Sequence, residues 1–191
     1  MIKLYNIGGK MSKIILPGLI CLLLFVLVQS ENNLNGKDKL KVVDTVEIKR
    51  YCGLWYEIAR IPNSFQAKCA GQVTAEYKLI QNGKLKVINR CKNENGNLTA
   101  AEGVAKIVDK KTNAKLKVSF VQIFGLNLFW GDYWIIGLDK NYKWAVVGNP
   151  DRKYGWILGR KPSLSGETMQ AIYKLLGKKG YDPAKFQMTA Q

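Results

Sequence analysis

The sequence predicts an all-β fold, namely an eight-stranded antiparallel up-and-down β-barrel with one C-terminal α-helix packed outside it. Three observations support this prediction. Between residues 51 and 159, short stretches alternate apolar residues with lysines, which is the two-residue period of a half-buried strand. Turn signals such as Asn82-Gly83 and residues 149–151 separate the stretches. A helical period begins only after residue 165.

Each predicted strand carries its lysines on one face, which we expect to face water. In residues 72–78, Val73, Ala75 and Tyr77 share the other, inner face, and the next strand continues the pattern after Asn82-Gly83. The predicted strands cover residues 51–61, 72–78, 84–90, 103–108, 115–121, 132–138, 143–148 and 154–159. Eight such strands close into a barrel whose interior holds one small ligand.

The inward faces predict an apolar lining with a few polar tips, as in small-molecule pockets. Gly103 and Ala105 are expected to leave room inside, while Asn89 and three tyrosine hydroxyls are expected to meet a polar headgroup. The alternative is that the aromatic side chains fill a small barrel without leaving a cavity. The predicted ligand-binding residues are Ala75, Tyr77, Leu85, Val87, Asn89, Ala105, Leu116, Val118, Phe120, Tyr133, Ile135, Val147, Tyr154 and Trp156.

One helix is predicted after the last strand. Ser165 can cap its N-terminus, and Met169, Ile172 and Leu176 follow at helical spacing. This apolar stripe predicts a face that docks on the outer wall of the barrel.

The first thirty residues have the layout of a secretory signal. Lys3, Lys10 and Lys13 precede an uncharged run over residues 14–28, which is short for a membrane span. We therefore expect a cleaved signal peptide at 1–30, a flexible segment at 31–41 and the barrel domain at 42–191; the alternative is a leader retained as an anchor. Leu19-Ile20 before Cys21 is a poor context for a lipidated cysteine.

The chain is strongly basic. Its formal net charge is +16, and losing the three lysines of the leader, with no acid, would leave +13. Such an excess favours anionic partners such as lipid headgroups or nucleic acid. The lysines are spread over nearly every strand, however, so a solubilising outer face is an equal alternative.

Three cysteines follow the leader, and an exported chain favours a disulfide. Cys69 and Cys91 flank the hairpin at Asn82-Gly83 and are the expected pair, which leaves Cys52 buried and unpaired. With a two-residue turn alone, Cys69 and Cys91 would lie about five residues out of register across the hairpin. The chain before Val73 must therefore fold back.

The residues that most catalytic sites need are missing. There is no histidine, and no Cys-x-x-Cys, phosphate-binding loop or Gly-x-Ser-x-Gly pattern occurs. We therefore predict no enzyme activity, no catalytic residue, no cofactor and no metal site.

Several motifs resemble those of the lipocalin family. Residues 53–60, Gly-Leu-Trp-Tyr-Glu-Ile-Ala-Arg, resemble the Gly-x-Trp opening of bacterial lipocalins and apolipoprotein D. Asp139 resembles the aspartate of the second motif, although its neighbours differ from the family's threonine and tyrosine. Arg160 matches the arginine of the third motif, and residues 149–152 resemble the bacterial branch.

The resemblance implies a calyx-shaped barrel in which Gly53, Trp55, Asp139 and Arg160 are structural, with Arg160 lying over the indole of Trp55. It also implies a carrier of fatty acids or lysophospholipids, exported to the periplasm or outer membrane of a Gram-negative bacterium. Such relatives contact membranes and can form homodimers, and no nucleic-acid partner is expected. Two alternatives remain open: a basic module that binds anionic surfaces, and a thiol-dependent lipocalin enzyme that uses Cys52.

Overall fold

The structure is a computed structural model that describes residues 39–191. The predicted signal peptide and most of the predicted flexible segment lie outside the described residues. Within residues 39–191, no helix has the length and apolar character needed to cross a bilayer.

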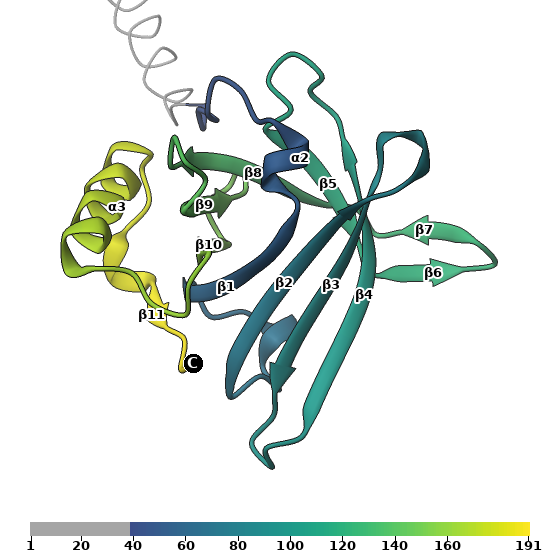
Figure 1. Ribbon diagram of the computed structural model, residues 1–191, viewed down its shortest axis with the longest axis horizontal. Helices are drawn as coiled ribbons and strands as arrows, with labels where there is room; N and C mark the ends of the chain where they lie inside the picture. Colours follow the sequence, from purple (N-terminus) through teal and green to yellow (C-terminus); the bar gives the residue numbers. More distant parts are fainter. Residues whose placement is uncertain (1–38) are drawn as a thin grey trace, which may run out of the picture. The chain divides into compact units, whose positions relative to one another are not determined.

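Eight antiparallel strands form a closed barrel, as predicted (Figure 1). The ring closes where Tyr56 in the first strand pairs with Gly159 in the last. The wall strands are β1 (Gly53–Arg60), β2 (Gly71–Leu79), β3 (Leu85–Lys92), β4 (Leu98–Ile107), β5 (Lys115–Ser119), β8 (Gly131–Leu138), β9 (Trp144–Gly148) and β10 (Gly155–Gly159).

A short helix that the sequence analysis did not predict lies at one end of the barrel. Helix α2 (Ile48–Tyr51) directly precedes β1, so the predicted strand at 51–61 begins two residues too early. Tyr51 and Trp55 pack inside this end with ring centroids 5.1 Å apart. We call it the closed end, and the opposite end, where β1 ends and β2 begins, the open end.

The predicted C-terminal helix packs outside the barrel. Helix α3 (Gly166–Lys178) begins at Ser165, whose hydroxyl accepts a hydrogen bond from the Thr168 amide. Met169, Ile172 and Leu176 are buried in a second apolar cluster against the outward side chains of the wall. The chain then passes through the turn η3 (Pro183–Lys185) to β11 (Gln187–Met188), which pairs with the end of β1.

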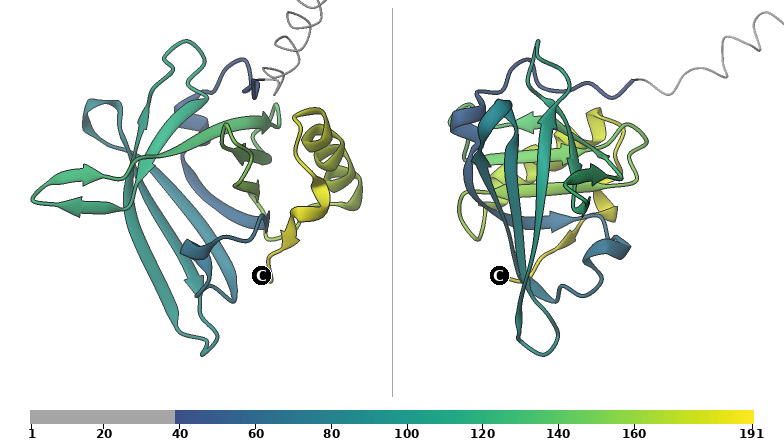
Figure 2. Two further views of the ribbon diagram at one scale, coloured as in Figure 1. Left: turned by 180° about the vertical axis from the view of Figure 1, so that it is seen from behind. Right: turned by 90° about the vertical axis from the view of Figure 1, so that its right-hand side faces the viewer.

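The largest departure from the predicted fold is a hairpin between the fifth and sixth wall strands. Strands β6 (Val121–Ile123) and β7 (Leu126–Leu128) pair only with each other and project from the side of the barrel opposite α3 (Figures 1 and 2). The predicted strand at 115–121 therefore ends at Ser119. Residues 120–130 are nearly all apolar, so no lysine marked where the chain leaves the wall.

Strand β4 has a free edge because of this departure. It is longer than predicted, since it begins at Leu98, and its residues from Leu98 to Ala105 pair with β3. On its other side, only residues from Val104 to Ile107 pair with β5. The wall is therefore open beside the first half of β4.

Two tight turns lie in the connections between the first three wall strands. The turn η2 (Gln81–Gly83) joins β2 to β3, and both Asn82 and Gly83 have positive φ, as that hairpin requires. The turn η1 (Ser64–Gln66) lies in the long loop between β1 and β2, at the open end.

Candidate functional site

The interior near the closed end is tightly packed. Eight of the predicted ligand-binding residues are buried in one apolar core that also contains Trp55. They come from β2, β3, β4, β5, β8 and β9 because alternate residues of each strand point inward. These eight are Tyr77, Leu85, Val87, Ala105, Leu116, Tyr133, Ile135 and Val147.

Three tyrosine hydroxyls within this core satisfy one another. The Tyr133 hydroxyl lies 2.7 Å from that of Tyr51 and 2.8 Å from that of Tyr77. Burial raises the pKa of all three phenols, that of Tyr77 to about 12, so they stay neutral. The hydroxyls of Tyr77 and Tyr133 are therefore hydrogen-bonded to each other inside the core, and their expected role in meeting a headgroup stays a prediction.

The interior nearer the open end remains accessible to solvent. Ala75, Asn89 and Ala101 face each other across β2, β3 and β4, yet Ala75 and Asn89 are only half-buried and Ala101 is exposed. Val118 and Trp156 are likewise half-buried and pack against the core. Because the wall is open beside the first half of β4, solvent reaches this part of the interior from the side as well as from the open end.

Asn89 is the polar residue in the interior nearer the open end. Its Oδ1 atom is buried and has no hydrogen-bond partner among the described residues. An unsatisfied buried acceptor costs about 1–3 kcal/mol, a cost that a ligand bearing a hydrogen-bond donor would remove.

The last two predicted lining residues lie at the rim. Phe120 is 41% exposed and Tyr154 is 36% exposed, so neither belongs to the buried core. Phe120 also corrects the expectation for Gly103, which leaves no free space. A Cβ atom on Gly103 would lie 2.5 Å from the Ser119 carbonyl oxygen and 2.7 Å from Phe120 Cδ1.

An aromatic cluster covers part of the open end. Phe65, from the loop between β1 and β2, lies 5.2 Å from Tyr154 and 6.1 Å from Trp156 between ring centroids. Phe65 is 62% exposed. The loop therefore places an apolar side chain over the mouth of the barrel without burying it.

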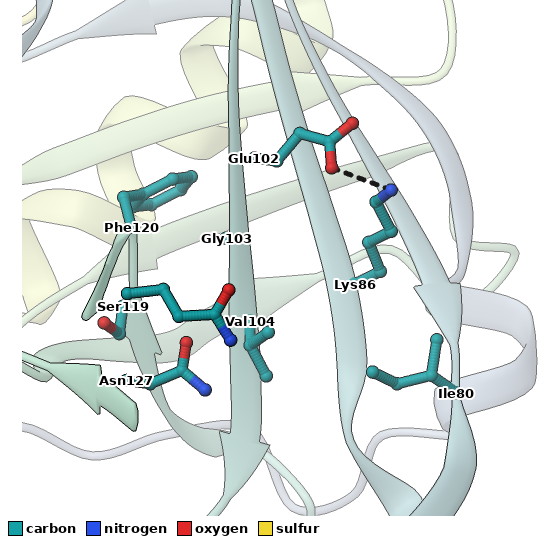
Figure 3. A pocket seen from close by; sticks show the side chains of 9 residues that line it. Ile80, Lys86, Glu102, Gly103, Val104, Ser119, Phe120 and Asn127 are labelled. Atoms are coloured by element: carbon teal, nitrogen blue, oxygen red, sulfur yellow. Dashed lines mark ion pairs between the residues drawn. The ribbon is translucent and has the colours of Figure 1, made fainter. Parts of the chain in front are cut away.

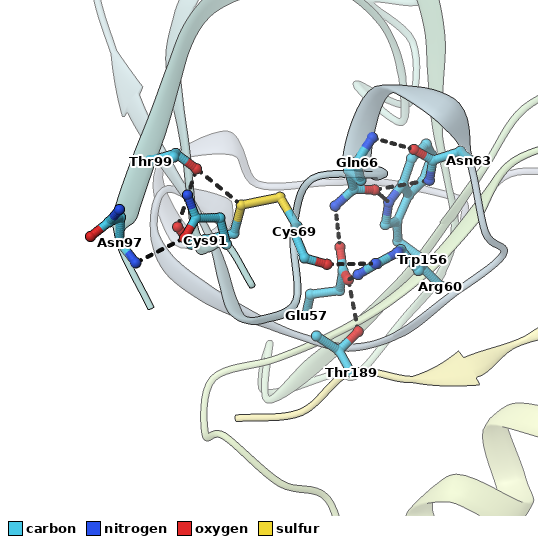
Figure 4. The surroundings of a disulfide bond; sticks show 11 residues. Glu57, Arg60, Asn63, Gln66, Cys69, Cys91, Asn97, Thr99, Trp156 and Thr189 are labelled. Carbon is cyan, nitrogen blue, oxygen red and sulfur yellow. Dashed lines mark hydrogen bonds and ion pairs between the residues drawn. A yellow bond between two sulfur atoms is a disulfide. The ribbon is translucent and has the colours of Figure 1, made fainter. Parts of the chain in front are cut away.

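A buried carboxylate fixes this loop, and the sequence analysis did not identify it. Glu57 is 3% exposed and accepts hydrogen bonds from Arg60 at 2.6 Å, from Gln66 at 2.8 Å and from Thr189 at 2.7 Å (Figure 4). Gln66 in turn accepts a hydrogen bond from the Trp156 indole at 2.9 Å. The Arg60 guanidinium also donates to the Cys69 carbonyl, so both its ion pair and this hydrogen bond lie within the protein.

The predicted disulfide is present and ties the same loop to the wall. Cys69 and Cys91 are bonded with their Cα atoms 5.6 Å apart (Figure 4). The chain folds back as expected, through a register shift between Gly71 and Thr74 that includes a positive φ at Gln72.

Cys52 is free, but it is half-buried rather than fully buried as predicted. Burial raises the pKa of its thiol, which lowers the fraction of reactive thiolate at neutral pH. Within residues 39–191, no cluster of three or more metal-ligating side chains occurs.

The expected structural residues lie at the closed end. The Arg160 guanidinium lies 3.8 Å from the centroid of the Trp55 ring and donates to the carbonyls of Leu54 and of residues 50–52. It also approaches Gly53, whose φ of 95° favours glycine. Asp139 orders the turn between β8 and β9 by accepting from the amides of Asn141 and Lys143 at 2.9 and 3.1 Å.

A shallow pocket lies where β4 meets the base of the β6–β7 hairpin. It has a volume of about 170 Å³, and an ion pair between Lys86 and Glu102 lies on one side of it (Figure 3). Phe120, Gln122 and Asn127 line its other side. The pocket marks the place where the wall opens.

Comparison with known proteins places this architecture in a family. The family model described as Lipocalin-like domain matches residues 46–191. The chain is 42% identical over 151 residues to Outer membrane lipoprotein Blc of Escherichia coli (strain K12), covering 78% of this chain and 82% of the relative. It is 37% identical over 158 residues to Temperature-induced lipocalin-1 of Arabidopsis thaliana, covering 81% and 84%.

A solved structure is also similar to this chain in fold. Insecticyanin from the tobacco hornworm Manduca sexta superposes with a TM-score of 0.64 at 25% identity, covering 80% of this chain and 84% of that one. The barrel and the external helix agree with these matches. The chain belongs to the lipocalin family.

Proposed function

We propose that this protein is a non-enzymatic carrier that holds one single-chain lipid, a fatty acid or a lysophospholipid, inside the barrel. One observation carries this proposal. The apolar interior is buried near the closed end, but nearer the open end, around Ala75, Asn89 and Ala101, it is accessible to solvent. Each methylene of an acyl chain buried there would contribute about 0.8 kcal/mol, so a long tail needs no specific contact.

The polar head would lie at the open end. Asn89 offers an unpartnered oxygen within the barrel, and the exposed side chains of Lys68 and Lys92 give the rim a positive charge. These groups favour a head that combines hydrogen-bonding capacity with a negative charge. The buried Glu57 does not oppose such a head strongly, because Arg60 neutralises it at 2.6 Å.

We place this carrier in the cell envelope. Relatives named as outer membrane lipoproteins support export, and so does the disulfide between Cys69 and Cys91, since such bonds persist in oxidising compartments.

Two adjacent alanines on β4 provide a matched test. Ala101 faces the interior opposite Asn89, whereas Ala100 lies opposite Arg90 on the outer face, and both are exposed. Ala101→Trp should fill the interior nearer the open end and lower the affinity for a fluorescent fatty acid at least ten-fold. Ala100→Trp should leave that affinity unchanged. Equal affinity in both variants, together with native mass spectra that show no bound lipid, would refute the carrier.

The same titration separates the two alternatives. A basic surface module would lose affinity steeply with added salt and would ignore Ala101→Trp. A thiol-dependent enzyme would lose turnover in Cys52→Ala, although the raised pKa of that thiol already argues against it. For the carrier we expect weak salt dependence and no effect of Cys52→Ala on lipid affinity.

A further inference from the structure

The β6–β7 hairpin exposes a concentration of apolar side chains. Phe124, at its tip, is 101% exposed, Phe129 is 81% exposed and Leu126 is 66% exposed. No charged residue occurs from Phe120 to Gly131. Contiguous apolar surface of this kind marks an interaction site rather than ordinary protein surface.

The two strands of the hairpin are hydrogen-bonded to each other along their facing edges. β6 pairs with β7 from Val121↔Leu128 to Ile123↔Leu126, and the turn between them uses positive φ angles at Phe124 and Gly125. At the base, the Ser119 hydroxyl donates to the Leu128 carbonyl and accepts a hydrogen bond from the Val121 amide at 3.4 Å. The outer edges of β6 and β7 pair with no other strand of residues 39–191, so the hairpin suits the headgroup and acyl boundary, where water still reaches these backbone groups.

Groups suited to a lipid headgroup layer lie at the base of the hairpin. The Trp130 indole donates to the Asn127 carbonyl at 3.0 Å, and the Lys106 ammonium lies 4.1 Å from the centroid of the Trp130 ring. Lys117 follows on β5, paired with Asp132 at 3.2 Å. An uncharged tip followed by tryptophan and then lysine is the order of residues found from the acyl region to the headgroups of a bilayer.

We propose that the β6–β7 hairpin is a docking arm that inserts its tip into the surface of a lipid bilayer with anionic headgroups. The formal net charge, +16 for the full chain and +13 without the three lysines of the leader, supplies the charge complementarity. Two three-residue strands reach about 10 Å, which is the depth of the headgroup and acyl boundary and far less than a full span.

The position of the arm connects it to the binding site, a step that rests on the proposed function. Phe120 begins the hairpin and also packs over Gly103, beside the free edge of β4. A docked hairpin would therefore hold the side opening of the barrel against the bilayer. An acyl chain could then pass from the membrane into the barrel through the wall, without crossing bulk water.

Vesicle binding by the full chain tests the arm directly. We expect sedimentation with vesicles of phosphatidylcholine containing a quarter of phosphatidylglycerol, and weaker sedimentation with phosphatidylcholine alone. The double variant Phe124→Ser/Phe129→Ser should partition at least ten-fold less, because two large apolar side chains no longer enter the bilayer. Met188→Ser is the matched control, since Met188 is 62% exposed on β11 and should not affect partitioning.

A second readout reports insertion even if the leader segment itself holds the chain on vesicles. Lipids brominated in the upper acyl chain should quench the fluorescence of Trp130, and Trp130→Phe should remove most of that quenching. Unchanged partitioning of the double variant together with no quenching of Trp130 would overturn the proposal. Self-association that depends on Phe124 and occurs without vesicle binding would overturn it in favour of a second copy as the partner.

Transfer kinetics separate this proposal from the carrier function. In Phe124→Ser/Phe129→Ser, equilibrium binding of a fluorescent fatty acid in solution should be unchanged, while its transfer from vesicles should slow at least ten-fold and no longer rise with vesicle concentration. If lipid binding itself is absent, the carrier fails. If binding is intact and transfer is equally fast, the docking arm fails.

Discussion

Arg160 holds several segments of the closed end together. It covers the Trp55 ring at 3.8 Å and donates to the Leu54 carbonyl at 2.7 Å and to three carbonyls of residues 50–52. One planar guanidinium thus joins the end of β10 to helix α2 and the start of β1. Lysine cannot reproduce this because its single ammonium has no forked geometry.

We therefore predict that Arg160→Ala lowers the free energy of unfolding by about 2–4 kcal/mol, through lost charged hydrogen bonds and the lost cation and ring contact. Urea denaturation measures this loss, with Lys161→Ala at the exposed neighbouring position as control. Arg160→Lys should recover only part of the stability, and fatty-acid affinity below the transition should be unchanged. Full stability in Arg160→Ala would contradict the structural role.

The buried tyrosines predict how stability depends on alkaline pH. Burial raises the pKa of Tyr77 from 10.0 to about 12, so the folded state retains a proton that the unfolded state loses. This contribution is complete below pH 10 and is lost as the pH rises towards 12. For Tyr77 alone the loss is roughly 2–3 kcal/mol, and Tyr51 and Tyr133 act in the same direction.

Thermal unfolding between pH 9 and 12 checks this prediction. Tyr77→Phe should be less stable than the wild type near pH 8, because Tyr133 loses a partner, but its stability should fall less steeply above pH 10. Tyr173→Phe, at a half-buried position on α3, should retain the wild-type slope. Identical slopes for all three proteins would show that the phenols do not govern the alkaline transition.

At the scale of elements, the loop between β1 and β2 depends on a few polar contacts and one covalent bond. Only a three-residue turn, η1, gives it regular structure. Its position comes from Glu57, from the Trp156 indole and from the disulfide to β3. The loop is therefore held at its middle by Gln66 and near its end by the disulfide, while the Phe65 side chain stays 62% exposed over the open end.

Removing the disulfide should loosen this loop and leave the rest of the barrel intact. The bond closes a sequence separation of 22 residues. By chain entropy it contributes about 3 kcal/mol to the free energy of unfolding. In Cys69→Ala/Cys91→Ala we expect that loss by calorimetry, with faster hydrogen exchange confined to residues 61–72.

Cys52→Ala serves as the control for this change, since Cys52 is not part of the disulfide. Unaltered exchange in the loop of the double variant would mean that the Glu57 network alone fixes it.

The elements that the sequence predicted correctly are those with a clear period. Strands β2 and β3 alternate lysines with apolar residues, and α3 has both a capping serine and a helical stripe. Helix α2 has four residues, too few to establish a period. The outward turn at Phe120 was missed because the segment is apolar on both faces, and alternation then indicates no side.

The inward faces of the strands were predicted from the same alternation, while the ligand-binding role of their residues stays a prediction. Alternation placed the lining residues on one face, but it could not tell which would be packed near the closed end and which would remain accessible. That distinction depends on side chains from other strands, such as Tyr51 against Tyr133 and Phe120 against Gly103. Glu57 was missed because its partner Thr189 is distant in the sequence.

At the scale of the whole molecule, the barrel and its ligand should stabilise each other. A ligand that binds only the folded state adds about 2.7 kcal/mol at a free concentration one hundred times its dissociation constant. Oleate, as a representative fatty acid, should therefore raise the melting temperature of the wild type and of Ala100→Trp, but not that of Ala101→Trp. A rise of equal size in all three would indicate binding outside the barrel.

The pairing of β1 with β10 has a consequence for how the protein is made. Tyr56 and Gly159 meet across about 100 positions of the chain, and contacts of such long range form slowly. Until that pair forms, β1 and β10 each present an open edge, and the interior is not enclosed. For the proposed carrier, a nascent chain therefore cannot take up its lipid before the ring has closed.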